Sequence, residues 1–172
     1  MPPERPGLVT FKGTPLTLVG QEVKPADAAP DFEVVANDLS TFRFSSMRGR
    51  VCILSSVPSL DTPTCNIETR RFNEEAAALG DQVAILTISM DLPFAQKRWC
   101  AAAGVERVKT YSDHRDAAFG QAYGVLIKEL RLLARAVFVV DSSGRVSYVQ
   151  LVKELADEPD YDAVLKAVKA LI

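Results

Sequence analysis

Residues 51–65, VCILSSVPSLDTPTC, decide the fold because they join a buried strand to the start of a helix. The apolar run within residues 50–56 is continuous rather than alternating, which is typical of a strand that is buried on both faces. Two further runs of this kind cover residues 83–89 and 136–141. Helical patterns lie between the three runs, and strands that alternate with helices predict an α/β domain built around a central sheet.

The second half of this stretch predicts a helix that begins at a proline. Proline is favoured at the first helical position and pushes the preceding residue toward extended geometry, so we expect Thr62 as the N-cap and Pro63 as the first helical residue. Cys65 then occupies the third helical position. Apolar and small residues recur at spacings of four and three from Cys65 to Leu79, and Gly80 supplies a stop signal, so the helix is expected to end at Leu79.

Turn signals and shorter patterns predict the remaining elements. Gly13 and its neighbours separate two apolar runs, and the turn at 37–38 separates two others, so each pair is expected to form a β-hairpin. The expected strands cover residues 8–10, 16–19, 32–35, 42–44 and 146–152. Three further helices are expected: one begins after Asp91, one covers about 117–123 and one covers about 161–171. No repeat or long linker is present, so we expect one domain over residues 1–172, with residues 1–23 as an N-terminal hairpin extension.

The composition excludes several classes of protein. The 172 residues carry 20 Lys and Arg against 22 Asp and Glu, a net charge of −2 that argues against a nucleic-acid partner. No apolar stretch reaches the ~20 residues that a membrane span needs, and the N-terminus leads into no signal-peptide core, so we expect a soluble cytoplasmic protein with no membrane partner. Three cysteines are an odd number, and a chain of this length builds its core without disulfide scaffolding. Any pairing in a reducing cytosol is therefore expected to be transient chemistry.

The position of Cys65 favours a reactive thiol. At the third helical position the backbone N–H has no partner within the helix and the positive end of the helix dipole is close, and both features stabilise a thiolate. The Thr62 hydroxyl, as the N-cap, is expected to lie beside the sulfur. Helix position alone leaves open the alternative that Cys65 is a small buried apolar residue on the inner face of the helix.

Three segments resemble the peroxiredoxin family. The pattern Pro58-x-x-x-Thr62-x-x-Cys65 is similar to the active-site signature of these proteins. Residues 29–32 (APDF) resemble the entry to their first core strand, and residues 133–141 (LARAVFVVD) resemble the segment that brings the active-site arginine. The resemblance implies a thioredoxin-like fold, with a central mixed sheet flanked by helices, and the activity of a thiol-dependent peroxidase.

The same resemblance assigns roles to four residues. Cys65 is the implied peroxidatic cysteine, Thr62 the hydroxyl that hydrogen-bonds peroxide and sulfur, Pro58 the wall that shields the site, and Arg135 the guanidinium that stabilises the thiolate. Attack of a thiolate on an O–O bond needs such preorganised donors, and it yields a sulfenic acid with water or an alcohol. For Arg135, the residues alone also allow a surface position at the entrance of a strand.

Two cysteines remain as candidates for the residue that resolves the sulfenic acid. Cys52 lies in the middle of an apolar strand, where an inert, packed thiol is expected. Cys100 follows two basic residues, which favour its thiolate. Residues 94–100 (FAQKRWC) resemble the resolving-cysteine helix of the bacterial thiol peroxidases, the atypical peroxiredoxins that have both cysteines in one subunit.

This closer resemblance implies a complete reaction cycle. Cys65 reduces hydrogen peroxide or an alkyl or lipid hydroperoxide in antioxidant defence, its sulfenic acid condenses with Cys100 into an intrachain disulfide, and thioredoxin reduces that disulfide. A homodimer is also implied, and the proposed chemistry is expected to require no cofactor or metal. Because a disulfide tolerates only ~6 Å between its Cα atoms, two cysteines on separate helices predict that one of these helices unwinds locally during the cycle.

Other kinds of chemistry find little support in the sequence. His114, the only histidine, lies in a polar loop where solvent exposure is expected, and neither a zinc-site spacing nor a Cys-x-x-Cys pair is present. Two alternatives stay open: a peroxidase that uses Cys65 alone with an external thiol, and a noncatalytic redox-sensing or binding protein. Replacement of Cys100 separates the first alternative from the two-cysteine cycle.

Overall fold

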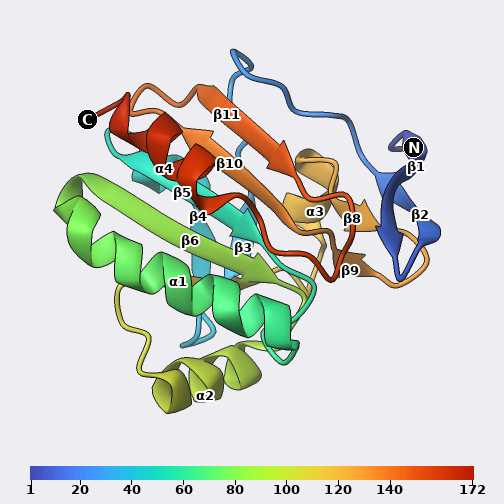
Figure 1. The fold of residues 1–172 in the computed structure, drawn as a ribbon, viewed down its shortest axis with the longest axis horizontal. Coiled ribbons are helices and arrows are strands. Elements are labelled where there is room, and N and C mark those ends of the chain that lie inside the picture. The colour runs from blue at the N-terminus through green and yellow to red at the C-terminus, as the bar shows by residue number, and fades with distance from the viewer.

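A seven-stranded mixed sheet lies at the centre of the computed structural model, which describes residues 1–172 (Figure 1). Its strands, in spatial order, are β11 (Val146–Leu151), β10 (Ala136–Val140), β5 (Val51–Ser56), β6 (Val83–Ser89), β7 (Lys109–Ser112), β3 (Glu33–Val35) and β4 (Thr41–Arg43). The strands β5, β6 and β7 are parallel, and those on either side of them are antiparallel. The predicted α/β class and the mixed central sheet are confirmed.

Three helices cover one face of this sheet. They are α1 (Pro63–Leu79), α2 (Pro93–Ala103) and α4 (Tyr161–Lys169), with α1 between the other two in Figure 1. Phe72 of α1 and Val164 of α4 pack into one apolar cluster with Ile53 and other residues of the sheet, and Trp99 of α2 packs against it. Every residue of β5 is buried, which confirms the prediction of a strand covered on both faces.

The opposite face carries the short helix α3 (Ala118–Ala122) and a 3₁₀ turn, η1 (Phe44–Met47). A second 3₁₀ turn, η2 (Gly80–Gln82), joins α1 to β6. Under this face Phe119 stacks on Tyr123, and Phe138 packs edge-on against both rings. Cys52 belongs to the same cluster, whereas its neighbours Val51 and Ile53 belong to the cluster under α1 and α4. Because side chains of a strand alternate between faces, Cys52 points away from α1.

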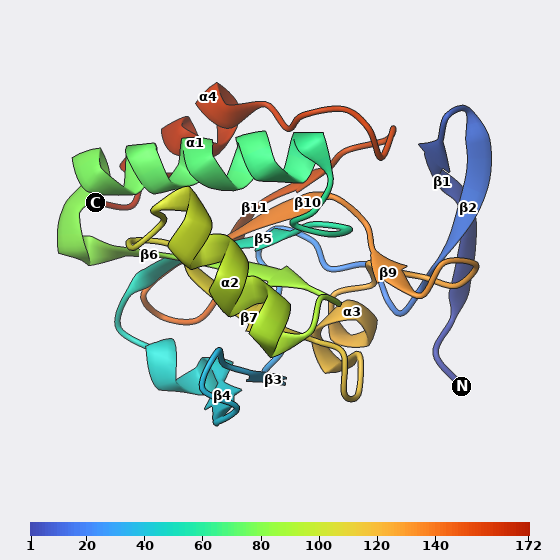
Figure 2. The same cartoon turned by 90° about the horizontal axis from the view of Figure 1, so that it is seen from below.

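A second sheet contains the N-terminal hairpin. Its strands are β1 (Glu4–Phe11), β2 (Thr14–Val19), β8 (Leu126–Ile127) and β9 (Leu132–Leu133), in that order. The hairpin of β1 and β2 is confirmed, and Figure 2 shows it standing at the end of the molecule away from the C-terminus. The pairing of β2 with β8 was not predicted, because strands of two residues carry no readable periodicity.

Local signals located most of the other elements. The helix α1 covers 63–79 and the hairpin of β3 and β4 forms, both as predicted. The helices α3 and α4 are shorter than their expected ranges of 117–123 and 161–171. The strand β7 was missed because its four residues, KTYS, show neither an apolar run nor a clear alternation. No helix combines the length and the apolar character that crossing a membrane requires.

Candidate active site

The first turn of α1 has the predicted geometry. Thr62 is the N-cap, with φ −82° and ψ 146°, and Pro63 is the first helical residue. The Thr62 Oγ1 atom accepts a hydrogen bond from the Cys65 backbone N–H at 3.3 Å. It donates its own proton to the Ser59 carbonyl oxygen at 3.0 Å. In this conformation the hydroxyl therefore fixes the start of the helix, and through it the position of Cys65.

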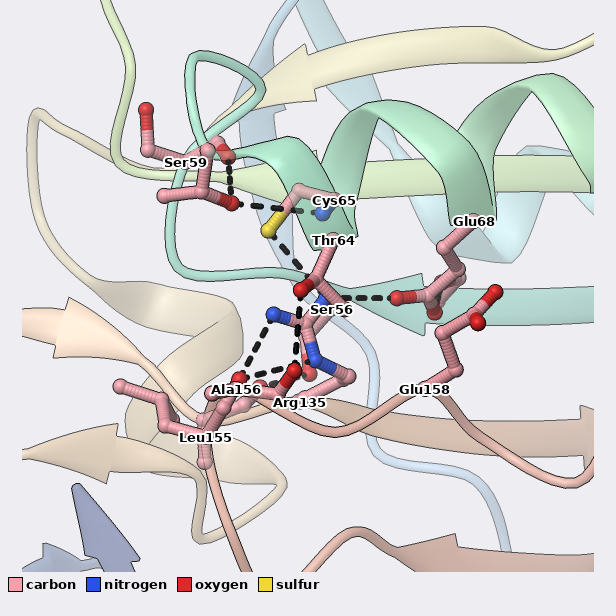
Figure 3. A network of polar contacts seen from close by, with 12 residues as sticks. Ser56, Ser59, Thr64, Cys65, Glu68, Arg135, Leu155, Ala156 and Glu158 are labelled. Carbon is pink, nitrogen blue, oxygen red and sulfur yellow. Dashed lines mark hydrogen bonds and ion pairs between the residues drawn. The ribbon is translucent and has the colours of Figure 1, made fainter. Parts of the chain in front are cut away.

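The thiol of Cys65 points into the protein and meets Arg135 (Figure 3). Arg135 Nη1 donates to Cys65 Sγ at 3.2 Å, and the two residues are 1% and 0% exposed. The surface position that the residues alone allowed for Arg135 is therefore wrong. A guanidinium tolerates such burial only when its donors have partners, and Arg135 has them.

The remaining donors of Arg135 hold its side chain in place. Nε and Nη2 donate to the Leu155 carbonyl oxygen at 3.1 and 2.7 Å, and Nη1 donates to Glu68 Oε2 at 2.7 Å. Thr64 Oγ1 donates to the Ala156 carbonyl oxygen at 2.9 Å, which ties the first turn of α1 to the segment that holds the arginine. A planar guanidinium anchored on two sides keeps Nη1 directed at the sulfur.

Glu68 is a site residue that the sequence patterns did not single out. Its side chain is 0% exposed, and Ser55 Oγ donates to its Oε1 atom at 3.0 Å. The available signal was its position, because residues three apart lie on the same face of a helix and Glu68 follows Cys65 by three. A glutamate at that position accompanies the thiol into the interior.

Burial and charge oppose each other in this ion pair. Burial raises the pKa of Glu68 to about 7, although Arg135 and Ser55 act in the opposite direction. Burial lowers the pKa of Arg135, but the neighbouring Cys65 and Glu68 charges outweigh it and raise this pKa above its usual value. The guanidinium therefore stays charged, whereas the carboxyl group titrates near neutral pH.

The raised pKa of Glu68 predicts a pH-dependent stability. Between the ordinary value of 4.5 and the native value of about 7, the native state binds a proton that the unfolded state has lost. Relative to Glu68→Gln, the unfolding free energy of the wild type is expected to fall by up to about 3 kcal/mol as the pH rises through this window, and then to level off. Urea unfolding of both proteins across the window measures this difference, and a difference that stays constant contradicts the prediction.

Apolar side chains close the site around the sulfur. Val57, Leu60 and Cys65 form a small buried cluster, and Trp99 of α2 packs against it. Pro58, the wall implied by the peroxiredoxin resemblance, is also buried. Exclusion of water lowers the local dielectric, and this strengthens the interaction between Arg135 and a thiolate at Cys65.

The other two cysteines lie in different surroundings, and all three are free thiols. Cys52 is buried on the opposite face of the sheet, and burial raises its pKa to about 11, which is the environment of an unreactive thiol. Cys100 is half-buried on α2, and its Sγ atom lies 3.4 Å from Thr110 Oγ1 of β7. Its thiol is therefore directed at β7, whereas the Cys65 thiol is directed at Arg135.

His114 has no part in this arrangement. It is half-buried rather than fully exposed, and its backbone N–H donates to Ser112 Oγ at 3.3 Å. No hydrogen bond joins its side chain to Cys65. No group of three or more His, Cys, Asp or Glu side chains is placed to bind a metal ion.

Removal of the Thr62 hydroxyl is expected to weaken both the helix start and the reactivity of Cys65. Thr62→Val loses a capping bond, so the unfolding free energy is expected to fall by about 1 kcal/mol. The rate constant of Cys65 with hydrogen peroxide is expected to fall roughly tenfold, because the first turn no longer holds its donors in place. Thr62→Ser keeps the hydroxyl and is expected to keep both properties. Stopped-flow kinetics test this, and a wild-type rate in Thr62→Val contradicts it.

A buried thiol at a helix N-terminus, held against an arginine beside a thioredoxin-like sheet, defines a thiol-based redox protein. The model of the Redoxin family matches residues 24–165. A thiol peroxidase from Bacillus subtilis (strain 168) is 57% identical, and the match covers 95% of this chain and 98% of that protein. A thiol peroxidase from Oceanobacillus iheyensis is 60% identical, and the match covers 91% of this chain and 95% of that protein. The crystal structure of a peroxiredoxin-like protein from Aquifex aeolicus is 47% identical with a TM-score of 0.90, and the match covers 95% of this chain and 96% of that one.

The chain belongs to the Redoxin family and, within it, to the bacterial thiol peroxidases. These matches extend over nearly the whole chain rather than over one motif. The thioredoxin-like fold that the peroxiredoxin resemblance implied is confirmed.

Proposed function

We propose that Cys65 attacks hydroperoxides and that Cys100 resolves the resulting sulfenic acid within the same chain. The observation that carries this proposal is the 3.2 Å contact between Cys65 Sγ and Arg135 Nη1 in a closed, apolar surrounding. The thiolate is the nucleophilic form of cysteine, and a fixed positive charge beside the sulfur favours it. Membership of the thiol peroxidases makes the chain a thiol-dependent peroxidase, and this geometry supports Cys65 as its nucleophile.

The first step transfers an oxygen atom to Cys65. The thiolate attacks one oxygen of the hydroperoxide, the S–O bond forms as the O–O bond breaks, and the departing oxygen takes a proton and leaves as water or an alcohol. Negative charge moves from the sulfur to the departing oxygen. Arg135 and the positive end of the α1 dipole stabilise this charge, while Pro58 shields the site and the Thr62 hydroxyl hydrogen-bonds the peroxide.

The second step forms a disulfide between Cys65 and Cys100. The Cys100 sulfur attacks the sulfenic sulfur of Cys65, the S–S bond forms, and the sulfenic oxygen leaves as water. Trp99, the residue before Cys100, already packs against the Cys65 cluster, which supports α2 as the source of the second thiol. Because the two thiols have different partners before the reaction, local unwinding of α1 or α2 precedes the disulfide.

The reductant and the assembly follow from family membership as further parts of the proposal. Thioredoxin is the proposed reductant, through thiol–disulfide exchange at the Cys65–Cys100 bond. Hydrogen peroxide and organic hydroperoxides are the proposed substrates, a homodimer is the proposed assembly, and the reducing cytoplasm is the proposed compartment. Antioxidant defence is the role that this chemistry serves.

Counting thiols after a single turnover tests the proposal. The reduced chain has three free cysteines. After one equivalent of hydrogen peroxide, titration in denaturant with an aromatic disulfide reagent is expected to find one, because Cys65 and Cys100 have both reacted. Cys65→Ser is the control and is expected to lose no thiol to the same dose.

Other counts favour the alternatives. Two remaining thiols support a peroxidase that uses Cys65 alone with an external thiol, and three contradict a role for Cys65 in peroxide chemistry. Repeated addition of peroxide in the presence of thioredoxin, its reductase and NADPH separates a catalyst from a redox sensor. A catalyst continues to consume peroxide, whereas a sensor stops after one equivalent.

A further inference from the structure

One carboxylate, that of Asp91, joins the segment of Cys65 to the segment that leads into the helix of Cys100. Ser59 Oγ donates to Asp91 Oδ1 at 2.7 Å, and the Leu60 backbone N–H donates to Oδ2 at 2.8 Å. Ser89 Oγ, at the end of β6, donates to the same Oδ2 atom at 2.7 Å. Bonds to a charged acceptor are stronger than neutral ones, so this carboxylate is a firm link to residues that lie 31 and 32 positions earlier in the chain.

On one side, the link leads to Cys65 through an unbroken chain of hydrogen bonds. The Ser59 carbonyl oxygen accepts bonds from both the backbone N–H and the hydroxyl of Thr62, at 3.1 and 3.0 Å. Thr62 Oγ1 in turn accepts the Cys65 N–H at 3.3 Å, and Figure 3 shows Ser59 beside this first turn of α1. The position of Asp91 therefore sets the position of the loop on which the cap of Cys65 depends.

On the other side, the link is anchored to the sheet. Ser112 Oγ of β7 donates to the Asp91 carbonyl oxygen. Gln96, which is fully buried on α2, donates to Ser89 Oγ at 3.0 Å and to the Tyr111 carbonyl oxygen at 2.8 Å. The segment that leads into α2 is held by the sheet as well as by Asp91. Loss of the carboxylate therefore loosens the segment before Cys65 more than the helix of Cys100.

We propose that Asp91 is a positioning residue that controls how Cys65 sulfenic acid divides between two fates. The inference rests on the proposed function of Cys65 and Cys100. In one fate the Cys100 thiol attacks the sulfenic sulfur and water leaves. In the other, a second hydroperoxide oxidises the sulfenic acid to a sulfinic acid and leaves as water or an alcohol. While the site stays folded, the second fate is favoured. Arg135 and Thr62 are then in place for reaction with another hydroperoxide, and the Cys100 thiol is directed at Thr110 of β7.

Loss of the carboxylate is expected to shift this division toward the disulfide. Asp91→Ala removes two bonds to the Cys65 segment, and opening of that segment is expected to become about tenfold more favourable. Disulfide formation after one equivalent of peroxide is expected to accelerate by the same factor. The ratio of sulfinic acid to disulfide in excess peroxide is expected to fall about tenfold, and the first reaction with peroxide is expected to slow.

Rapid quenching with an alkylating reagent, followed by mass spectrometry of the intact protein, measures both products over time. Asp61→Ala is the matched control: it removes a carboxylate from the same loop, but Asp61 is exposed and its side chain makes no hydrogen bond. Asp91→Asn keeps an acceptor and the size of the side chain, so it is expected to restore part of the wild-type ratio. Ser59→Ala removes the bond from Ser59 Oγ to Asp91, together with the bond that Ser59 Oγ accepts from the Asp61 backbone N–H at 3.2 Å, but it leaves the Leu60 bond to Asp91. A smaller shift in the same direction is therefore expected, and this variant keeps the test available where Asp91→Ala does not fold.

The outcomes separate this inference from the function on which it rests. A wild-type product ratio in both Asp91→Ala and Ser59→Ala overturns the role of Asp91, and so does an equal shift in Asp61→Ala. Failure of the proposed function has a different signature, because the wild type then forms no disulfide between Cys65 and Cys100. A raised sulfinic fraction in Asp91→Ala also contradicts the inference, since the link would then favour the disulfide.

Discussion

Arg135→Met is expected to slow the reaction of Cys65 with hydrogen peroxide by about 10²- to 10³-fold, the loss that follows removal of one preorganised donor at a reacting centre. The substitution leaves a side chain of similar length but removes the donor that lies 3.2 Å from the sulfur. Both the thiolate and the charge on the departing oxygen then lose their main partner. Stopped-flow fluorescence of Trp99, the only tryptophan, which packs against the Cys65 cluster, follows the reaction directly.

A second variant keeps this prediction testable if the first one is unstable. Arg135→Met alone leaves the buried Glu68 carboxyl without its partner and is expected to cost about 3–5 kcal/mol of stability. Arg135→Met combined with Glu68→Gln removes both charges and is expected to fold more stably while reacting as slowly. Reaction of the folded double variant at the wild-type rate contradicts the role of Arg135.

Cys100→Ser is expected to abolish peroxide turnover that is coupled to thioredoxin while leaving the first oxidation of Cys65 unchanged. The serine hydroxyl cannot attack the sulfenic sulfur to form a disulfide, so the cycle stops after one turnover. Cys100 contacts Thr110 rather than Arg135, so its replacement leaves the Cys65 site intact. Consumption of NADPH in the presence of thioredoxin and its reductase measures turnover, and Trp99 fluorescence measures the first step.

Cys52→Ser is the matched control for this prediction. Cys52 is buried on the far face of the sheet, and its pKa is raised to about 11 by burial. We therefore expect Cys52→Ser to retain turnover with thioredoxin. Wild-type turnover in Cys100→Ser contradicts the two-cysteine cycle and supports a peroxidase in which an external thiol resolves Cys65.

The parts of the fold that were predictable are those with a complete local signal. The helix α1 has a proline start, a regular apolar stripe and a glycine stop, and its bounds of 63–79 agree with the structure. The strands β8 and β9 have two residues each, and only their pairing with the N-terminal hairpin gives them their structure. Such pairing depends on contacts between distant segments, which a local pattern does not contain.

The residues of the site also differ in whether a local pattern or a contact between distant segments places them. Thr62 and Cys65 lie within one turn of helix, so spacing alone places them together. Arg135 comes from a segment 70 residues away, and the residues alone left a surface position open, because burial of a guanidinium depends on partners supplied by the whole fold. Two of those partners, the carboxylate of Glu68 and the carbonyl oxygen of Leu155, complete the site. A backbone carbonyl leaves no mark in the sequence, because any residue provides one.

The most direct test of the central claim is to identify which sulfurs join after one equivalent of peroxide. Free thiols are alkylated, the protein is digested without reduction, and linked peptides are identified by mass spectrometry. We predict a single cross-link between the peptides of Cys65 and Cys100, with Cys52 alkylated. A cross-link that contains Cys52, or a Cys65 sulfenic acid that persists while Cys100 is alkylated, would contradict the proposed cycle.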